Sequence, residues 1–437
     1  MGTQEQIVKI QDDDPYILFQ LPLENFNFNG ENLTERHPLT ITSDTLFLTG
    51  AFSDGTSNIL TNLEAQNLSY KTPALAFTDA TLKIDDFAQE SSHTQIHAKN
   101  MSLPNLPLLS NPFELTLNTI GAQTSAQLKF DNTPILMQLD GQLSIPQKNF
   151  WGQIQTNIFD LKDVTIPIQK LWPNLPANIT NLSGLVRVFG QLAWRGPYNV
   201  TGPLNVALKD LSFDINNTAI SGLNTVLTLN SVRPLSTNDV QHVFVQSIDA
   251  FIPFQNLDMT FQVDPQNVRL NRLSVSTANI PLSLPPSVIP VKNANMLTYL
   301  KNDLPINLTD LQQNITLDDL SMASGTANIT MPIEFINGAL SLSNITLKMQ
   351  NAWLKREGDD YASFFGDATA YFIRTGQVIM DKNKIIQLAL NGRLRPSNVA
   401  KDINKNDIQL PASFFQPIQP QTPPQDIQQR LDSIFKH

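Results

Sequence analysis

The residue pair whose spacing is best suited to chemistry is His93 and His97, four positions apart. On a helix this spacing would place two imidazoles on one face, where they could share a metal ion. The surrounding sequence, TQIHAKNMSL, is typical of a strand or loop, and no acidic third ligand follows at a useful distance. We therefore predict that the chain has no metal site and no cofactor.

Two acidic runs are the other candidates for ion binding: Asp12 to Asp14, and Glu357 to Asp360. Neither has the alternating ligand spacing of a calcium-binding loop, so a solvated turn is the better interpretation of both. The chain also lacks a G-x-S-x-G nucleophile motif, a P-loop and a dinucleotide-binding fingerprint. These observations predict a protein that is not an enzyme.

The composition narrows the choice of partner. The 437 residues include 29 Lys and Arg against 39 Asp and Glu, a net charge of −10, with no dense basic run. Nucleic-acid binders need a basic surface to displace counterions from phosphates, so nucleic acid is not expected as a partner. The absence of cysteine excludes disulfides, thiolate metal sites and cysteine nucleophiles.

Apolar residues alternate with polar ones over most of the chain, and this period of two indicates β-strands with one apolar face. Leu257 to Val263 is the clearest run. The alternation shifts between Leu270 and Leu273, and again between Leu342 and Ile345, which indicates β-bulges or a short turn between two strands. The apolar residues that we single out from this pattern are Leu204, Val206, Leu208, Leu223, Leu227, Leu229, Leu257, Met259, Phe261, Val263, Leu340, Leu342, Ile345, Leu347, Ile386, Leu388 and Leu390.

Helical patterning is scarce. Val291 to Leu300 and Leu304 to Leu311 are short candidates, and a longer one follows Pro423 and Pro424 at the C-terminus. That terminal helix is amphipathic. It could plug a groove in the sheet, lie on a membrane or pack back on the sheet. Its apolar residues, spaced i, i+4, i+7 and i+8, are Ile427, Leu431, Ile434 and Phe435.

These patterns predict an all-β protein, with an elongated, twisted, mostly antiparallel sheet, a few short helices and a C-terminal amphipathic helix. We expect a β-rich repeat region over residues 1–200, a second β region over 201–416, and a proline-rich linker with the terminal helix over 417–437. A sheet of this length can close on itself, stack on a second sheet or curl into a trough. The periodicity does not choose among these three.

An ordered series of motifs resembles a known family. GPLNVALKDLSFD begins at Gly202, SGLNTVLTLNSVRPLSTNDVQHVFVQSIDAFIPFQNLDMTFQV begins at Ser221, and SGTANITMPIEFINGALSLSNITLKM begins at Ser324. The series resembles the C-terminal half of the YdbH-like intermembrane phospholipid transport proteins. This family is also called the "dicarboxylate transport" domain, and it belongs to the AsmA-like group with TamB and YhdP. The chain departs from it at Ala278 to Pro281, where members tend to have a glycine pair.

The resemblance implies a lipid transport protein in the periplasm of a Gram-negative bacterium, anchored to the inner membrane. Its sheet would form a trough, or β-groove, that shields phospholipid acyl chains between the inner and outer membranes, lined by the apolar residues singled out above. An outer-membrane lipoprotein would dock at a sheet edge near the C-terminus. The N-terminal sequence MGTQEQIVKIQDDDPY has no apolar anchor, so membrane association would depend on residues upstream of it.

Two other functions remain open at this point. The first is a structural or interaction module of the envelope, such as an adhesin or assembly factor, with a closed β core made from the same alternating residues. The second is a small-anion binder, as the "dicarboxylate" label suggests, which would need converging cations. Arg269 and Arg272 form the only close arginine pair in the resembling region.

Overall fold

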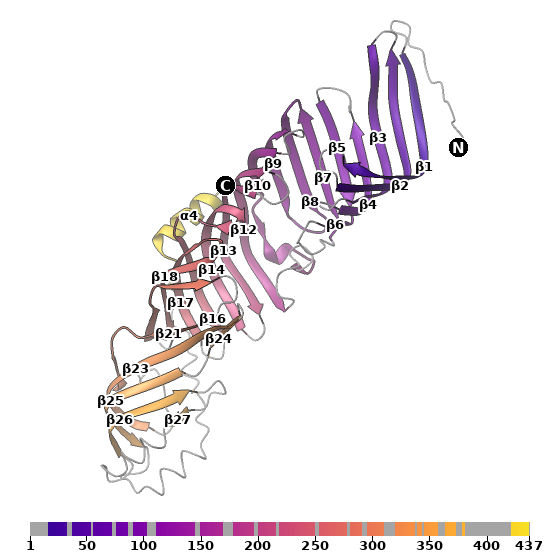
Figure 1. Cartoon of the computed structure of the whole chain (residues 1–437). Coiled ribbons are helices and arrows are strands. Elements are labelled where there is room, and N and C mark those ends of the chain that lie inside the picture. The colour runs from indigo at the N-terminus through magenta and orange to yellow at the C-terminus, as the bar shows by residue number, and fades with distance from the viewer. Residues whose placement is uncertain are drawn as a thin grey trace. The chain divides into compact units, whose positions relative to one another are not determined.

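The computed structural model is almost entirely β-strand (Figure 1). The strands pair antiparallel and belong to one open sheet within the part of the chain that the structure describes. The all-β, antiparallel fold predicted from the alternation is therefore confirmed. The described residues are 16–32, 37–53, 56–71, 76–85, 91–102, 111–144, 149–168, 178–195, 200–215, 218–249, 253–277, 280–290, 295–309, 320–336, 339–342, 345–356, 363–372, 378–380 and 421–436.

The helical elements are short. Within the described residues, the 3-10 turn η1 (Leu161–Asp163) follows β11, and helix α4 (Gln425–Phe435) lies where the sequence predicts a terminal helix. No helix in the described residues is long and apolar enough to cross a membrane. The strands are β1 (Tyr16–Asn32), β2 (His37–Ser53), β3 (Thr56–Lys71), β4 (Ala76–Asp85), β5 (Ser91–Ala98), β6 (Asn100–Ser102), β7 (Phe113–Ile120), β8 (Gln123–Phe130), β9 (Leu136–Ser144), β10 (Asn149–Thr156), β11 (Phe159–Asp160), β12 (Ile179–Arg195), β13 (Val200–Ile215), β14 (Thr218–Arg233), β15 (Leu235–Ser236), β16 (Gln241–Asp249), β17 (Pro253–Val263), β18 (Asn267–Thr277), β19 (Ile280–Leu284), β20 (Ser287–Pro290), β21 (Asn295–Lys301), β22 (Ile306–Asn307), β23 (Leu320–Ile336), β24 (Ala339–Leu342), β25 (Ile345–Arg356), β26 (Ser363–Phe372) and β27 (Val378–Met380).

The helix predicted over Val291 to Leu300 is wrong. Its described part is strand β21, which pairs with β23 along its whole length. Leu297 and Tyr299 are exposed, whereas Thr298 and Leu300 are buried, so the burial follows a period of two. Pairing with a neighbouring strand therefore overrode a weak local helical pattern. In the other short candidate, Leu304 to Leu311, only Leu308 and Thr309 are helical within the described residues.

The chain divides into two compact units. Unit 1 comprises Met1–Val206 and Leu229–Pro234, and unit 2 comprises Ala207–Thr228 and Leu235–His437. Strands β13 and β14 contribute residues to both units.

In unit 1, apolar residues form a row across eight strands. Residues directly opposite each other in antiparallel strands point to the same face, so a chain of such pairs marks a line across the sheet. Leu46 and Ala65, near one end of the row, are buried, and the other members whose burial is described are half-buried. The row runs through Leu23, Leu46, Ala65, Leu82, Ile96, Leu115, Leu128 and Met137.

The opposite face of unit 1 is polar and almost neutral. A parallel row there consists mainly of amide and hydroxyl side chains, and Gln155 Nε2 donates to Gln138 Oε1 at 3.0 Å. One face of this sheet is therefore suited to water and the other to hydrocarbon. The polar row runs through Glu64, Lys83, Gln95, Thr116, Gln127, Gln138 and Gln155.

Left-handed backbone conformations recur inside the strands of unit 1 as well as at turns. Asn25 in β1, Asn67 in β3 and Asp79 in β4 have φ of 51°, 49° and 54°. Asn67 Nδ2 donates to Asp44 Oδ2 of β2 at 2.6 Å, and the β3–β4 register shifts on both sides of Leu68. Bulges bend a strand and increase its twist, so these three left-handed residues mark a line of bending across β1, β3 and β4.

Candidate functional site

The apolar residues of β14, β16 and β17 share one face of unit 2. Val245 is opposite both Leu223 and Leu257, and Val243 is opposite both Thr225 and Met259. Phe261, opposite Gln241, continues the same alternation along β17. We call this side of the unit 2 sheet the lining face.

The lining face continues through the following strands. Leu273 is opposite both Met259 and Leu284, and Leu300 of β21 is opposite Met331 of β23. The register of β17 and β18 shifts between Thr260 and Phe261, so the predicted slip in alternation between Leu270 and Leu273 is confirmed as a β-bulge. The bulge returns Leu270 to the lining face, opposite Phe261. The residues of this continuation that are almost completely buried include Leu270, Val275, Ile280, Leu282, Leu284, Leu300 and Met331.

The predicted lining residues themselves are less buried than this. In a filled sandwich core, inward-facing leucines and phenylalanines are close to fully buried. Here each of the ten whose burial is described is half-buried, so part of each side chain remains open to solvent. These ten are Leu204, Val206, Leu208, Leu223, Leu227, Leu229, Leu257, Met259, Phe261 and Val263.

The remaining predicted lining residues are placed by backbone pairing or lie outside the described residues. β24 and β25 are separate strands that both pair with β23. The predicted shift in alternation between Leu342 and Ile345 therefore lies between two strands. Ile386, Leu388 and Leu390 lie outside the described residues. The pairs formed by the other four are Leu340 with Phe335, Leu342 with Ile333, Ile345 with Phe372, and Leu347 with Ile329.

The structure does not bring His93 and His97 together. Both lie on strand β5, where His93 Nδ1 is hydrogen-bonded to Asn118 Oδ1 and His97 Nε2 lies 3.1 Å from Asp131 Oδ2. Among the described residues, no group of three or more His, Asp or Glu side chains is placed to hold a metal ion. The acidic runs at 12–14 and 357–360 lie outside the described residues.

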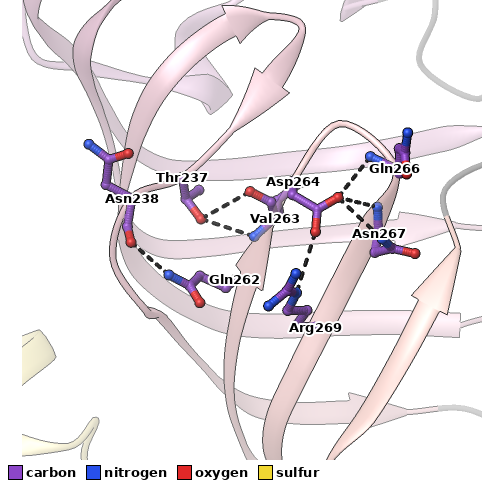
Figure 2. Close-up of polar contacts among 8 residues, drawn as sticks. All are labelled: Thr237, Asn238, Gln262, Val263, Asp264, Gln266, Asn267 and Arg269. Carbon is purple, nitrogen blue, oxygen red and sulfur yellow. Dashed lines mark hydrogen bonds and ion pairs between the residues drawn. The ribbon is translucent and has the colours of Figure 1, made fainter.

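Arg269, the first of the two arginines considered for anion binding, already has an anionic partner. Its Nε lies 3.4 Å from Asp264 Oδ2 in the connection between β17 and β18 (Figure 2). The other carboxylate oxygen of Asp264 accepts hydrogen bonds from the backbone amides of Gln266 and Asn267, at 2.9 and 2.8 Å. These bonds, led by that from Gln266, lower the pKa of Asp264. Asp264 therefore stabilises the turn between β17 and β18, and Arg269 of β18 is its ion-pair partner.

Helix α4 packs on the opposite side of the sheet from the lining face. His242 Nδ1 lies 2.8 Å from Asp426 Oδ2 of α4, and His242 Nε2 lies 2.6 Å from Asp258 Oδ1 of β17. His242 alternates with Val243, and Asp258 alternates with Leu257 and Met259. α4 thus contacts the face that carries His242, Phe244 and Asp258, which we call the helix face. The sequence allowed three arrangements of the terminal helix, and the structure shows the one in which the helix packs back on the sheet.

Acid should weaken the docking of α4 on the helix face. Burial of Asp426 raises its pKa. The hydrogen bond to His242, the charge of His242 and hydrogen bonds from two backbone amides act in the opposite direction and outweigh burial, so the pKa of Asp426 is lowered. A lowered carboxylate pKa stabilises the docked state above the ordinary Asp range, about pH 4, and this stabilisation is lost as the pH falls through the lowered pKa. Because the chain has no cysteine, a spin label on Gln429→Cys should report the change as higher mobility at pH 3 than at pH 6.

Asp426→Asn is the control for this titration. It removes the carboxylate, so the part of the pH dependence that Asp426 contributes should disappear. Asp432, Asp258, Lys209 and Arg430 remain in place. A label whose mobility changes equally with pH in both proteins would contradict the role given to Asp426.

Sequence reasoning missed the residues that hold α4 to the sheet. His242 and Asp426 are separated by 184 positions, and the local sequence around neither of them points to the other. The only signal in the sequence was the apolar face of the helix, on which Ile427 and Leu431 are buried. That signal predicts that the helix packs against another part of the protein, but it does not identify the strands that the helix contacts.

A comparison with models of known protein families gives a match to this chain. The family model described as "YdbH-like: Intermembrane phospholipid transport protein YdbH" matches residues 22–284. The match includes the motifs that begin at Gly202 and Ser221, extends over most of the preceding 200 residues, and ends before the motif at Ser324. No curated protein and no solved structure matches the chain.

Proposed function

The chain belongs to the YdbH-like family of intermembrane phospholipid transport proteins, and we propose that it carries phospholipid through the periplasm on the apolar faces of its sheet. In this proposal the sheet of each unit curls into a trough, or β-groove. The acyl chains lie against its apolar residues, and the headgroup stays in water at the open side. The lining residues are those singled out from the sequence.

The observation that carries this proposal is the set of apolar residues, many of them half-buried, that share one face of each unit. Removing a CH₂ group from water is worth about 0.8 kcal/mol, so an acyl chain of about 16 carbons gains on the order of 10 kcal/mol from an apolar path. In unit 1 the row from Leu23 to Met137 crosses eight strands. At about 4.8 Å per spacing, seven spacings give a path of about 34 Å.

The bends in the strands support a trough over a flat sheet. Bulges and positive-φ residues are the usual means by which a sheet acquires curvature. They occur in unit 1 at Asn25, Asn67 and Asp79, and in unit 2 at Asn256 and Asn351. The last two coincide with register shifts in β17–β18 and β25–β26.

Native mass spectrometry of the protein released gently from cells tests this proposal. We expect phospholipid to remain bound, and we expect detergent washing to remove it and incubation with phospholipid vesicles to restore it. A protein that is free of lipid after gentle purification and takes up none from vesicles would contradict the proposal.

The family also suggests how such a protein reaches both membranes. We propose that it is anchored to the inner membrane and that an outer-membrane lipoprotein docks at a sheet edge near the C-terminus. An unpaired edge strand can bind a partner strand through main-chain hydrogen bonds, which gives the docking a physical basis.

The two other functions have less support. A structural module with a closed core would bury residues such as Leu257, Met259 and Phe261 fully, and they are half-buried. A small-anion site built on Arg269 and Arg272 would have to compete with Asp264, which already contacts Arg269. Neither alternative is favoured by a specific observation.

A further inference from the structure

The C-terminal segment is bonded to four different strands of unit 2. Each contact joins a side chain or backbone group of this segment to a residue that lies 165 to 223 positions earlier. The segment therefore runs across the strands of the sheet. The contacts are Gln421 N to Asn256 Oδ1 of β17 (3.4 Å), Asp426 Oδ2 to His242 Nδ1 of β16 (2.8 Å), Arg430 Nη2 to Thr228 Oγ1 of β14 (3.3 Å), and Asp432 Oδ1 to Lys209 Nζ of β13 (3.2 Å).

Apolar burial accompanies these four polar contacts. Ile427 and Leu431 of α4 are 3% and 2% exposed. On the helix face of the sheet, Val226 and Phe244 are each 3% exposed. Each fully buried side chain of this size stabilises the docked helix. The helix is therefore held by burial as well as by charge.

The two end contacts lie at bends in the strands. Asn256 is itself a left-handed residue, with φ of 54°, at the register shift of β17. Lys209 precedes Asp210, whose φ is also 54° and whose backbone amide donates to Asn224 Oδ1 of β14 at 3.1 Å. Bulges are positions where a strand's direction can change, so a segment tied to both of them, through Gln421 before α4 and Asp432 within it, restrains that direction.

We propose that α4 is a strap that fixes the spacing and bend of β13, β14, β16 and β17, and through them the shape of the lining face on the other side of the same strands. The strands are one layer thick, so a displacement on the helix face moves the lining face with it. The effect on lipid rests on the proposed function, and the effect on the strands does not. The strap thus regulates how tightly unit 2 holds an acyl chain.

The test compares two new carboxylates on one helix. Leu431→Asp places a charge on the buried side of α4, and Gln429→Asp places the same charge on its exposed side. Hydrogen exchange of β14, β16 and β17 should become faster in Leu431→Asp by about tenfold or more, the factor expected for losing one buried leucine. Exchange should be unchanged in Gln429→Asp, and in β7 and β8 of unit 1 for both variants.

Charge reversal provides a second measurement that leaves the apolar side of α4 intact. Asp432→Lys places like charges at the Lys209 contact and should also speed exchange in β13 and β14, by a smaller factor because this contact is partly exposed. The double variant Lys209→Asp with Asp432→Lys restores opposite charges and should return exchange to that of the unaltered protein. Failure of this rescue would overturn the contact at β13.

Lipid retention is measured on the same proteins by native mass spectrometry after incubation with phospholipid vesicles. Retention should fall in Leu431→Asp and remain unchanged in Gln429→Asp. If exchange in the strands does not respond to Leu431→Asp, α4 is not a strap, whatever happens to lipid. If exchange responds and retention does not, the strap does not regulate the lining face, and the proposed function stands. If the unaltered protein retains no lipid, the proposed function fails and the exchange data alone decide the strap.

Discussion

Replacing Phe261 by Asp should block phospholipid retention and transfer while the sheet stays folded. Phe261 is half-buried on the lining face, opposite Gln241 and Leu270. The change removes an aromatic contact worth about 1.5–3 kcal/mol and places a carboxylate against hydrocarbon, at a cost of several kcal/mol more. We expect retention to fall about a hundredfold or more. Native mass spectrometry and transfer of a labelled phospholipid between vesicles measure the loss.

Thr260→Asp is the matched control for this substitution. Thr260 is the adjacent residue of β17, opposite His242, so its side chain points to the helix face. The same new charge, one position away, should leave lipid retention close to that of the unaltered protein. Equal loss of lipid in both variants would show that any charge in β17 is damaging and would remove the support for a lining role of Phe261. Circular dichroism and the urea midpoint check that both proteins are folded.

Replacing Gly190 by Ala should destabilise unit 1 by about 2–4 kcal/mol, because strain and a backbone collision add together. Gly190 has φ of 152°, a conformation that other residues rarely adopt. A Cβ at this position would lie 2.1 Å from the carbonyl oxygen of Pro203 and 2.9 Å from Leu204 Cα. Both atoms belong to the backbone of β13, so the contact can be relieved only by separating β12 from β13. Hydrogen exchange of these two strands in urea measures the change.

Gly121→Ala separates the two contributions. Gly121 also has a positive φ, 57°, in the turn between β7 and β8, but a Cβ there would have no atom within 4 Å. Only the conformational cost remains, about 1 kcal/mol. If Gly190→Ala is no more destabilising than Gly121→Ala, the close approach of β12 and β13 has no energetic importance.

The parts of the fold that depend on local alternation could be predicted from the sequence. The run from Leu257 to Val263 predicted strand β17 and its apolar side, and the shift between Leu270 and Leu273 predicted the bulge in β18. A period of two is set by the strand backbone itself, so it is visible without knowledge of the partner strand. The terminal helix was predictable for the same reason, with a period of 3.6.

Features that depend on distant partners could not be predicted. Val291 to Leu300 has apolar spacing that fits either a helix or a strand, and pairing of its described part with β23 decided the outcome. The bends at Asn25, Asn67 and Asp79 use residue types that are also common in ordinary turns. The residue type alone therefore does not distinguish a bend inside a strand from a turn between two strands. How open the lining face is depends on side-chain burial, which the alternation of Leu257, Met259 and Phe261 does not encode.

The distances in sequence between bonded elements also have a consequence for the order of folding. Most strands pair with one that is next or next but one along the chain, so each hairpin can form soon after its residues are available. α4 is the exception, since Asp432 meets Lys209 across 223 positions. During synthesis from the N-terminus, the sheet of unit 2 can therefore assemble progressively, whereas α4 can dock only after residues 421–436 have been made. A chain interrupted before residue 421 would therefore lack the contacts that this segment makes with β13, β14, β16 and β17.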